Sequence, residues 1–199
     1  MFNFKIYFMS EQSPLSLGTE DIKKLLMRYA VPAIVAMTAA SLYNMMDSIF
    51  IGHGVGALGI AGLAVTFPFI NLAAAFGSLV GVGASTLVSV KMGQKDLKSA
   101  EAVLGNVLLL NTVIGFLFMT VCLIFLDPIL YFFGASADTL PYARDYMKVI
   151  LYGNLITHIY MGLNEVMRAS GYPQRAMMAT LFAVLINGVL NALFIFVLD

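Results

Sequence analysis

Residues 29–56 read YAVPAIVAMTAASLYNMMDSIFIGHGVG, an apolar run with the pattern of a membrane helix and two unusual residues inside it. Asp47 is followed by residues 48–90, which contain no Asp, Glu, Lys or Arg. An acidic side chain in a bilayer costs about 2.5 to 3.5 kcal/mol on insertion scales, so it indicates a functional role. Pro32 lacks an N–H and its ring crowds the preceding turn, which predicts a kink in this helix.

Two polar residues share a face of this predicted helix with Asp47. Tyr43 precedes it by four residues and Asn44 by three, and these spacings bring side chains together on an α-helix. A simpler interpretation of the carboxylate also exists, in which it reaches toward water from the end of the helix. The sequence alone leaves both interpretations open.

The composition is that of an integral membrane protein. Hydrophobic residues make up 60% of the 199 residues and charged residues 11%, whereas soluble domains are about half apolar and a quarter charged. The mean hydropathy is +0.90. The long uncharged runs reach the ~20 residues that a spanning helix needs, and they lack the alternation of membrane β-strands. We therefore predict an all-α, multi-pass helical bundle.

Five transmembrane helices are predicted after a cytoplasmic N-terminal segment, residues 1–20. Their predicted ranges are 21–51, 60–90, 102–126, 142–170 and 174–198. Pro68 predicts a break within the second helix. A glycine-rich stretch predicts a flexible connection between the first two helices, and Asp127 with Pro128 is expected to end the third.

The distribution of basic residues predicts the orientation in the membrane. Of the eleven Lys and Arg residues, all except Arg144 and Lys148 belong to the amino terminus or to the connections after the second and fourth predicted helices. Short cytoplasmic segments are enriched in Lys and Arg. The amino terminus and those two connections are therefore expected on the cytoplasmic side of the inner membrane.

Several classes of function are not supported by the sequence. The single cysteine, Cys122, lies in an apolar run and cannot build a disulfide framework or a thiolate metal site. His53 and His158 are far apart without a carboxylate motif beside them, and no Ser/His/Asp set or HExxH motif is present. The net charge is zero, and no basic tract with interleaved aromatic residues is found. We therefore expect neither an enzyme, nor a bound cofactor, nor a nucleic-acid partner.

Four motifs carry a resemblance to a known family. They are the pattern from Pro32 to Asp47 followed by SIFIGHGVGALGIAGLAVTFPF, then MGQKD, then RASGYPQRAM, and finally INGVLNALFIF. In this order and at these spacings they resemble the multidrug and toxic compound extrusion (MATE) family, in its DinF-like prokaryotic branch. The resemblance runs from Ile22 through the rest of the chain.

The resemblance implies a secondary transporter with two six-helix lobes around a central cavity. Such a protein exports drugs, organic cations and other amphiphiles in exchange for H⁺ or Na⁺, and its repeats meet at a central site. This chain would supply five helices of the N-terminal lobe. The expected partners are the lipid bilayer, small organic substrates and a second lobe of the same polypeptide, which this sequence lacks.

The resemblance also implies a cation-coupling site built from Asp47, Tyr43 and Asn187. The family has a second Asp four residues after that Asn, where this chain has Asn191. Two close carboxylates can share a proton through a raised pKa, whereas one carboxylate with two amides cannot do so in that way. The coupling ion, H⁺ or Na⁺, therefore stays open, and Na⁺ would be held by oxygens of Asp47, Asn187 and Asn191.

Plainer roles and other functions remain as alternatives. Asn187 and Asn191 could form interhelical hydrogen bonds, and the kinks at Pro32 and Pro68 could be passive rather than conformational. A lipid-linked oligosaccharide flippase of the wider superfamily would be expected to carry several Arg or Lys in its cavity, and the charge-free runs offer none. A non-transporting half-protein would be distinguished by the absence of a second lobe after Asp199.

Overall fold

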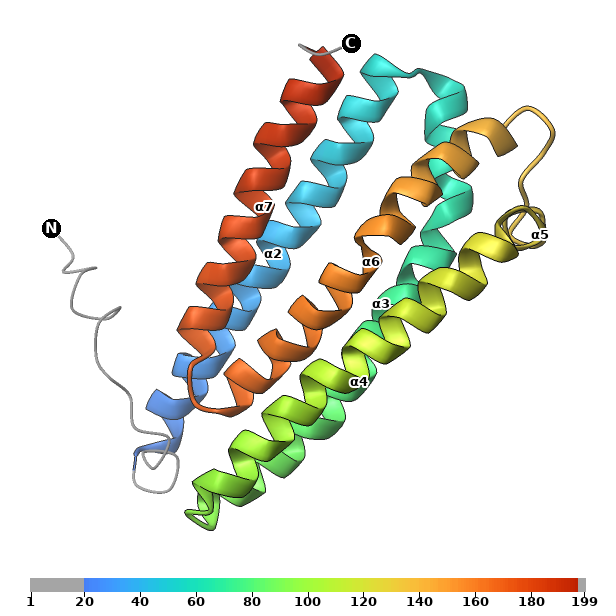
Figure 1. Cartoon of the computed structure of the whole chain (residues 1–199). Coiled ribbons are helices and arrows are strands. Elements are labelled where there is room, and N and C mark those ends of the chain that lie inside the picture. Colours follow the sequence, from blue (N-terminus) through green and yellow to red (C-terminus); the bar gives the residue numbers. More distant parts are fainter. Residues whose placement is uncertain (1–19, 197–199) are drawn as a thin grey trace, which may run out of the picture.

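The structure is a computed structural model that describes residues 20–196, apart from the side chains of residues 192 and 194–196. In this part of the chain every regular element is a helix (Figure 1). The helices are α2 (Ile22–Gly54), α3 (Ala57–Gly93), α4 (Leu97–Ile124), α5 (Leu126–Phe132), α6 (Leu140–Ala169) and α7 (Pro173–Phe196). The prediction of an all-α bundle is confirmed.

The helices pack in two groups. α3, α4 and α6 contact one another along their lengths, and α2 packs mainly against α7 (Figure 1). α7 also contacts α6, whereas α2 makes few contacts with α3. A three-helix bundle and a helix pair are thus joined chiefly through α7.

Short turns connect the helices. The carboxylate of Asp21 caps α2 by accepting a hydrogen bond from the Lys23 backbone N–H over 2.9 Å, and acidic caps satisfy backbone donors that a helix start leaves free. Gly56 and Gly171 have φ angles of +89° and +91°, which glycine adopts without the strain that a side chain adds. These glycines allow α2 to turn into α3 and α6 into α7 within a few residues.

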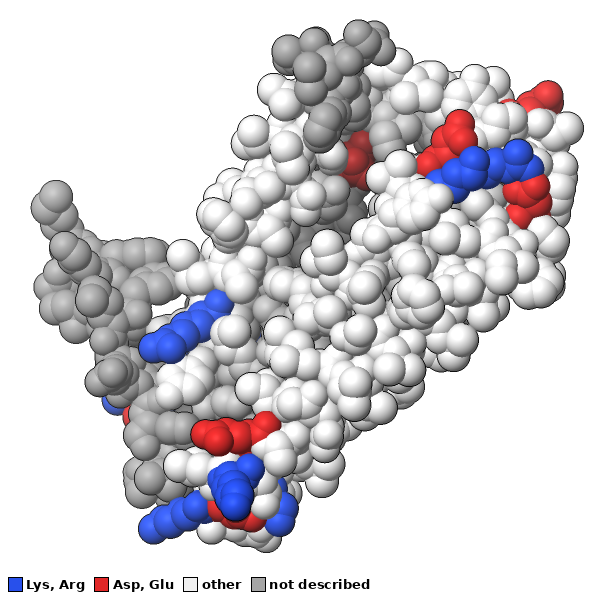
Figure 2. All heavy atoms as spheres, viewed as in Figure 1, with Lys and Arg blue, Asp and Glu red and all other residues white. Residues whose placement is uncertain are grey.

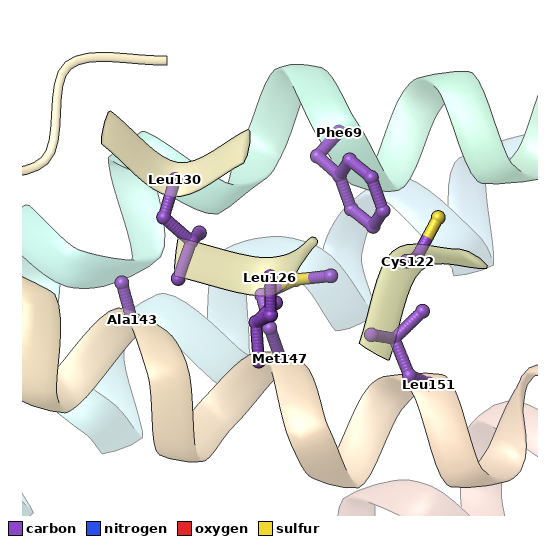
Figure 3. Close-up of a cluster of buried hydrophobic side chains, with 7 residues drawn as sticks. All are labelled: Phe69, Cys122, Leu126, Leu130, Ala143, Met147 and Leu151. Atoms are coloured by element: carbon purple, nitrogen blue, oxygen red, sulfur yellow. The ribbon is translucent and has the colours of Figure 1, made fainter. Parts of the chain in front are cut away.

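One apolar core lies where α5 crosses the end of the bundle. α5 directs Leu126 and Leu130 inward, and both are buried. They join side chains of α3, α4 and α6, and the buried members of the cluster (Figure 3) are Phe69, Cys122, Leu126, Leu130, Ala143, Met147 and Leu151. This cluster fixes α5 against the three-helix bundle.

Small residues bring α3, α4 and α6 close together in the middle of the bundle. His158 of α6 is buried against Gly77 of α3 and Gly115 of α4. Its Nε2 lies 3.1 Å from the carbonyl oxygen of Ala73. Glycines at helix interfaces permit such close approach in membrane proteins, so here they make room for a polar side chain inside the bundle.

Polar side chains also tie the first turns of α7 to α6. The hydroxyls of Tyr160 and Thr180 lie 2.8 Å apart, and Asn164 donates from Nδ2 to the carbonyl oxygen of Ala176 over 3.1 Å. Asn164 is buried. Because a buried amide without partners is costly, these contacts hold the start of α7 in a defined place.

The structure corrects two predictions about where helices end. The flexible glycine connection expected between residues 51 and 60 is only residues 55–56, since α2 continues to Gly54 and α3 begins at Ala57. Asp127 and Pro128 do not end the third predicted helix, because α4 already ends at Ile124 and both residues belong to α5. Pro128 stands in the first turn of α5, where backbone N–H groups have no intrahelical partner to lose.

Four of the described helices are long and apolar enough to cross a membrane: α2, α3, α4 and residues Pro173–Asn191 of α7. α6 has 30 residues but is more polar, because it carries Asn154, His158 and Asn164 into the interior, where they are buried. Figure 2 shows charged side chains gathered toward the two ends of the molecule, with uncharged surface between them. This distribution fits a bundle that spans a bilayer.

Pro32 and Pro68 both lie inside continuous helices. Pro32 is buried in α2, and Pro68 is exposed on α3. Each proline leaves the carbonyl four residues earlier without its usual helical donor. A conformational role for either proline stays a prediction.

Candidate functional site

The candidate site lies between α2 and α7, the helix pair of the fold (Figure 1). Tyr43 and Asp47 are one helical turn apart on α2, and both are half-buried. Their spacing of four residues places them on one side of the helix, and the structure shows that this side faces Asn191 of α7. Two helices far apart in sequence thus meet through polar side chains.

Asn191 bridges the two residues of α2. Its Nδ2 donates to Oδ1 of Asp47 over 2.8 Å and to the hydroxyl oxygen of Tyr43 over 3.3 Å. A side-chain amide nitrogen has two hydrogens, so this geometry uses its whole donor capacity. The carbonyl oxygen of Asn191 and the second carboxylate oxygen of Asp47 are left as acceptors without a hydrogen bond in the described part of the chain.

The carboxylate of Asp47 has no basic partner among the described residues. The ion pairs found there join Arg28 with Glu20, Lys91 with Asp96, Arg144 with Asp127, Lys148 with Asp145 and Arg168 with Glu165. A half-buried carboxylate whose hydrogen bond within the described residues comes from one amide is a place where an added cation would be stabilised.

Two of the predicted neighbours of Asp47 are not joined to it. Asn187 lies one turn before Asn191 on α7, but its side chain is exposed and forms no hydrogen bond with another described residue. Asn44 is exposed as well, and its carbonyl oxygen accepts from the hydroxyl of Ser48 over 3.0 Å. The geometry therefore supports Tyr43, Asp47 and Asn191 as one group, while the role of Asn187 stays a prediction.

Tyr146 of α6 lies near the candidate site and was missed by sequence reasoning. Its half-buried phenol lies within electrostatic range of both Asp47 and Tyr43. No sequence signal distinguishes it from the other eight of the nine tyrosines, because it lies on a helix that meets α2 only through the tertiary fold. Tyr146 places a polar group of the three-helix bundle near Asp47 and Tyr43.

The donor atoms suit a hard cation or a proton. Carboxylate, amide and hydroxyl oxygens are ligands for cations such as Na⁺, Ca²⁺ and Mg²⁺, whereas transition metals favour imidazole and thiolate. No group of three or more His, Cys, Asp or Glu that could hold a metal ion occurs among the described residues. The arrangement can therefore bind one small cation through oxygens, or take up a proton on Asp47.

Comparison with known proteins places the chain in context. The family model described as MatE matches residues 32–193. This range contains Tyr43, Asp47, Asn187 and Asn191, so it includes every residue of the predicted cation site.

Individual relatives agree with this match. The chain is 28% identical over 188 residues to the multidrug export protein MepA of Staphylococcus haemolyticus (strain JCSC1435), and the match covers 94% of this chain and 42% of the relative. An outward-facing multidrug resistance MATE family transporter of the MOP superfamily is 27% identical, with a TM-score of 0.87 over 95% of this chain and 42% of that one. A MATE crystal structure in the bent conformation is 28% identical, with a TM-score of 0.86 over 94% and 42%. The chain thus spans 42% of the length of these proteins.

Proposed function

This chain belongs to the MatE family, and on that premise we propose that it forms the N-terminal lobe of a secondary active antiporter for drugs and other organic amphiphiles or cations. Its relatives are multidrug export transporters, and its helices are those of a multi-pass membrane protein. Export would be driven by H⁺ or Na⁺ entering through the site at Asp47. The amino terminus would face the cytoplasm, as the distribution of Lys and Arg predicts.

The observation that carries the proposal is the hydrogen bond from Asn191 to Asp47. It joins α2 to α7 through the half-buried acidic side chain of the candidate site. An acidic residue inside a membrane costs free energy, and such residues typically occur in substrate or ion pathways and in binding sites. A link between helices that depends on the charge of one carboxylate is suited to coupling ion binding with helix packing.

The amide of Asn191 explains how an ion would act on this link. In the structure its donor end faces Asp47. A cation on the carboxylate repels amide hydrogens and attracts the carbonyl oxygen, so Asn191 would turn its Oδ1 toward the ion. Binding of a cation therefore replaces the contacts to Tyr43 and Asp47 with new ones. A proton on Asp47 would instead weaken the charge-assisted hydrogen bond.

The flippase alternative is supported less well by the site. A pyrophosphate-linked substrate needs basic side chains in the cavity, and among the described residues no ion pair joins a Lys or Arg side chain to Asp47. The relatives named above are exporters and not enzymes. A drug or cation antiporter therefore remains the function that the site supports best.

The proposal is tested by drug efflux in sealed vesicles that contain the chain together with the second lobe expected from its relatives. A proton gradient or a sodium gradient is imposed, and wild type is compared with Asp47→Asn and Asn191→Asp. Asp47→Asn removes the charge at constant size and should lower gradient-driven export at least about tenfold, while substrate binding stays detectable. Asn191→Asp creates two facing acids, and it should shift the pH dependence of export because both cannot ionise cheaply.

Asp138→Asn serves as the matched control, because Asp138 is exposed in the connection between α5 and α6. It should export at the wild-type rate. If Asp47→Asn also exported at the wild-type rate under both gradients, the coupling ion would not pass through this lobe and the proposal would be wrong.

A further inference from the structure

α5 marks the level at which one end of the bundle meets the lipid headgroups. It lies across the ends of the longer helices (Figure 1), with Leu126 and Leu130 buried beneath it. Its other side presents Tyr131 and Phe132, and Phe132 is 84% exposed. Aromatic side chains gather at the boundary between hydrocarbon and water. Residues beside α5 therefore lie at headgroup depth.

A recess of about 330 Å³ opens beside α5 at this depth. It lies where the end of α4, the start of α5 and the first turns of α6 meet, and it is lined by Leu123, Ile124, Leu126, Asp127, Pro128, Arg144 and Lys148. One part of this lining is apolar and the other part is charged. An amphiphile with a polar head and an apolar tail matches such a lining.

The charges of the lining do not cancel. Arg144 donates from Nε to Oδ1 of Asp127 over 2.7 Å and from its terminal nitrogen to Oδ2. This pair is neutral, yet a guanidinium has five N–H donors in total, so Arg144 keeps donors for a further acceptor. Lys148 adds one positive charge; it forms an ion pair with Asp145 over 3.7 Å, and Asp145 is 80% exposed and does not line the recess. The residues that line the recess therefore carry one positive charge in excess, and a bound anion would compete for Lys148 with the exposed Asp145 outside the lining.

An apolar surface continues from the recess toward the middle of the bundle. On α4, the exposed residues Leu117, Val121 and Ile124 follow one another at helical spacing, and on α6 Tyr152 and Ile156 follow Lys148 in the same way. Side chains three or four residues apart stack along one face of a helix. Because α4 and α6 are packed neighbours, the two stripes flank a path that an acyl chain can occupy.

We propose that this recess binds the phosphodiester headgroup of an anionic glycerophospholipid, with Lys148 as the principal charge partner and Arg144 as a second donor. The singly charged phosphodiester balances the excess charge of the lining, and the acyl chains lie along the stripes of α4 and α6. Lys and Arg side chains near a membrane surface attract anionic lipid headgroups. The site is separate from Asp47 and does not depend on the transport proposal.

The chain has no tryptophan, so one introduced indole reports on its lipid neighbours without background. Tyr152→Trp places the reporter four residues after Lys148, at an exposed position. The variant is reconstituted in phosphatidylcholine with increasing brominated phosphatidylglycerol, and quenching of its fluorescence is measured. We expect the brominated lipid to be enriched about fivefold at this reporter, the factor that one lysine near anionic lipid contributes.

Three controls make the result specific. Leu185→Trp, at an exposed position of α7, should report no enrichment. Lys148→Met in the Tyr152→Trp protein should abolish enrichment, whereas Lys148→Arg should keep it and Lys95→Met should leave it unchanged. Equal enrichment of brominated phosphatidylethanolamine, which carries no net charge, would overturn the proposal, and so would enrichment that persists in Lys148→Met.

Discussion

Gly81 of α3 and Gly162 of α6 meet backbone to backbone: a Cβ on Gly81 would lie 2.8 Å from the Cα of Gly162. Real Cβ atoms do not approach backbone so closely, so the helices would have to move apart to admit even a methyl group. In a lipid bilayer the hydrophobic effect does not drive helices together, so van der Waals packing at such close contacts contributes much of their association free energy. The contact therefore makes a direct test of the packing of α3 on α6.

Gly81→Ala should destabilise the bundle by roughly 1 to 3 kcal/mol, the usual cost of overpacking. Gly83→Ala is the matched control, because a Cβ there has nothing within 4 Å. The control should be neutral or slightly stabilising, since alanine favours helix over glycine. The buried Cys122 provides the readout, because a thiol-reactive dye labels it only when the protein unfolds on heating. Equal unfolding temperatures for the two variants would contradict the close contact.

Ser136 lies in the connection between α5 and α6 and is exposed, and Lys95 is exposed between α3 and α4. The predicted orientation places these two connections on opposite sides of the membrane. In intact cells, an impermeant thiol reagent should label Ser136→Cys and leave Lys95→Cys unlabelled, and Cys122 should stay silent because it is buried. Labelling of Lys95→Cys from outside would reverse the orientation.

Pro32→Ala restores one backbone N–H inside α2 and removes a ring that crowds the preceding turn. It should bias α2 toward a straight helix and thereby favour one conformation of the lobe. In the complete transporter, export should fall while the amount of folded protein in the membrane stays constant. Pro68→Ala, on the exposed side of α3, gives a comparison within the same protein. Unchanged export in Pro32→Ala would mean that Pro32 has no conformational role.

Tyr146→Phe removes a hydroxyl that lies within electrostatic range of Asp47 and Tyr43. If Tyr146 helps to stabilise the ion-bound site, export by this variant should need a steeper ion gradient to reach half of its maximal rate. Tyr152→Phe on the same helix is the control, because that residue is exposed and should tolerate the change. Identical gradient dependence in both variants would place Tyr146 outside the site.

The helical architecture and the shared face of Tyr43 and Asp47 could be predicted from sequence because both rest on local spacing. Hydropathy identifies long apolar helices, and the four-residue spacing from Tyr43 to Asp47 defines a face of α2. Pairing that face with Asn191 came from the family resemblance, and the structure brings the three side chains together. Residue spacing alone could not predict whether the side chain of Asn187 faces the site. Its exposure depends on the rotation of α7 about its axis.

Features that depend on tertiary contacts were missed. α5 has only seven residues, and its inward side chains become a helix face only when a bundle end is present to cover them. Tyr146 lies near the site because α6 packs against α7. The sequence of α6 alone does not show which helices pack against it. The connection between the first two helices was predicted too long, because glycine with positive φ, here Gly56, permits a turn of two residues.

α7 is attached to α6 near its start and to α2 further along, so it can tilt about its first turns. Contacts at Thr180 and Ala176 fix its first turns to α6, and Asn191 fixes a later turn to α2. From Thr180 to Asn191 a helix rises roughly 16 Å at about 1.5 Å per residue. A displacement of about one ångström at Asn191, the scale of one rotated amide, therefore corresponds to a tilt of roughly 3 to 4 degrees of α7 about its fulcrum at Thr180. Because α2 makes few contacts with the three-helix bundle, the tilt angle of α7 determines the orientation of the α2–α7 pair relative to α3, α4 and α6.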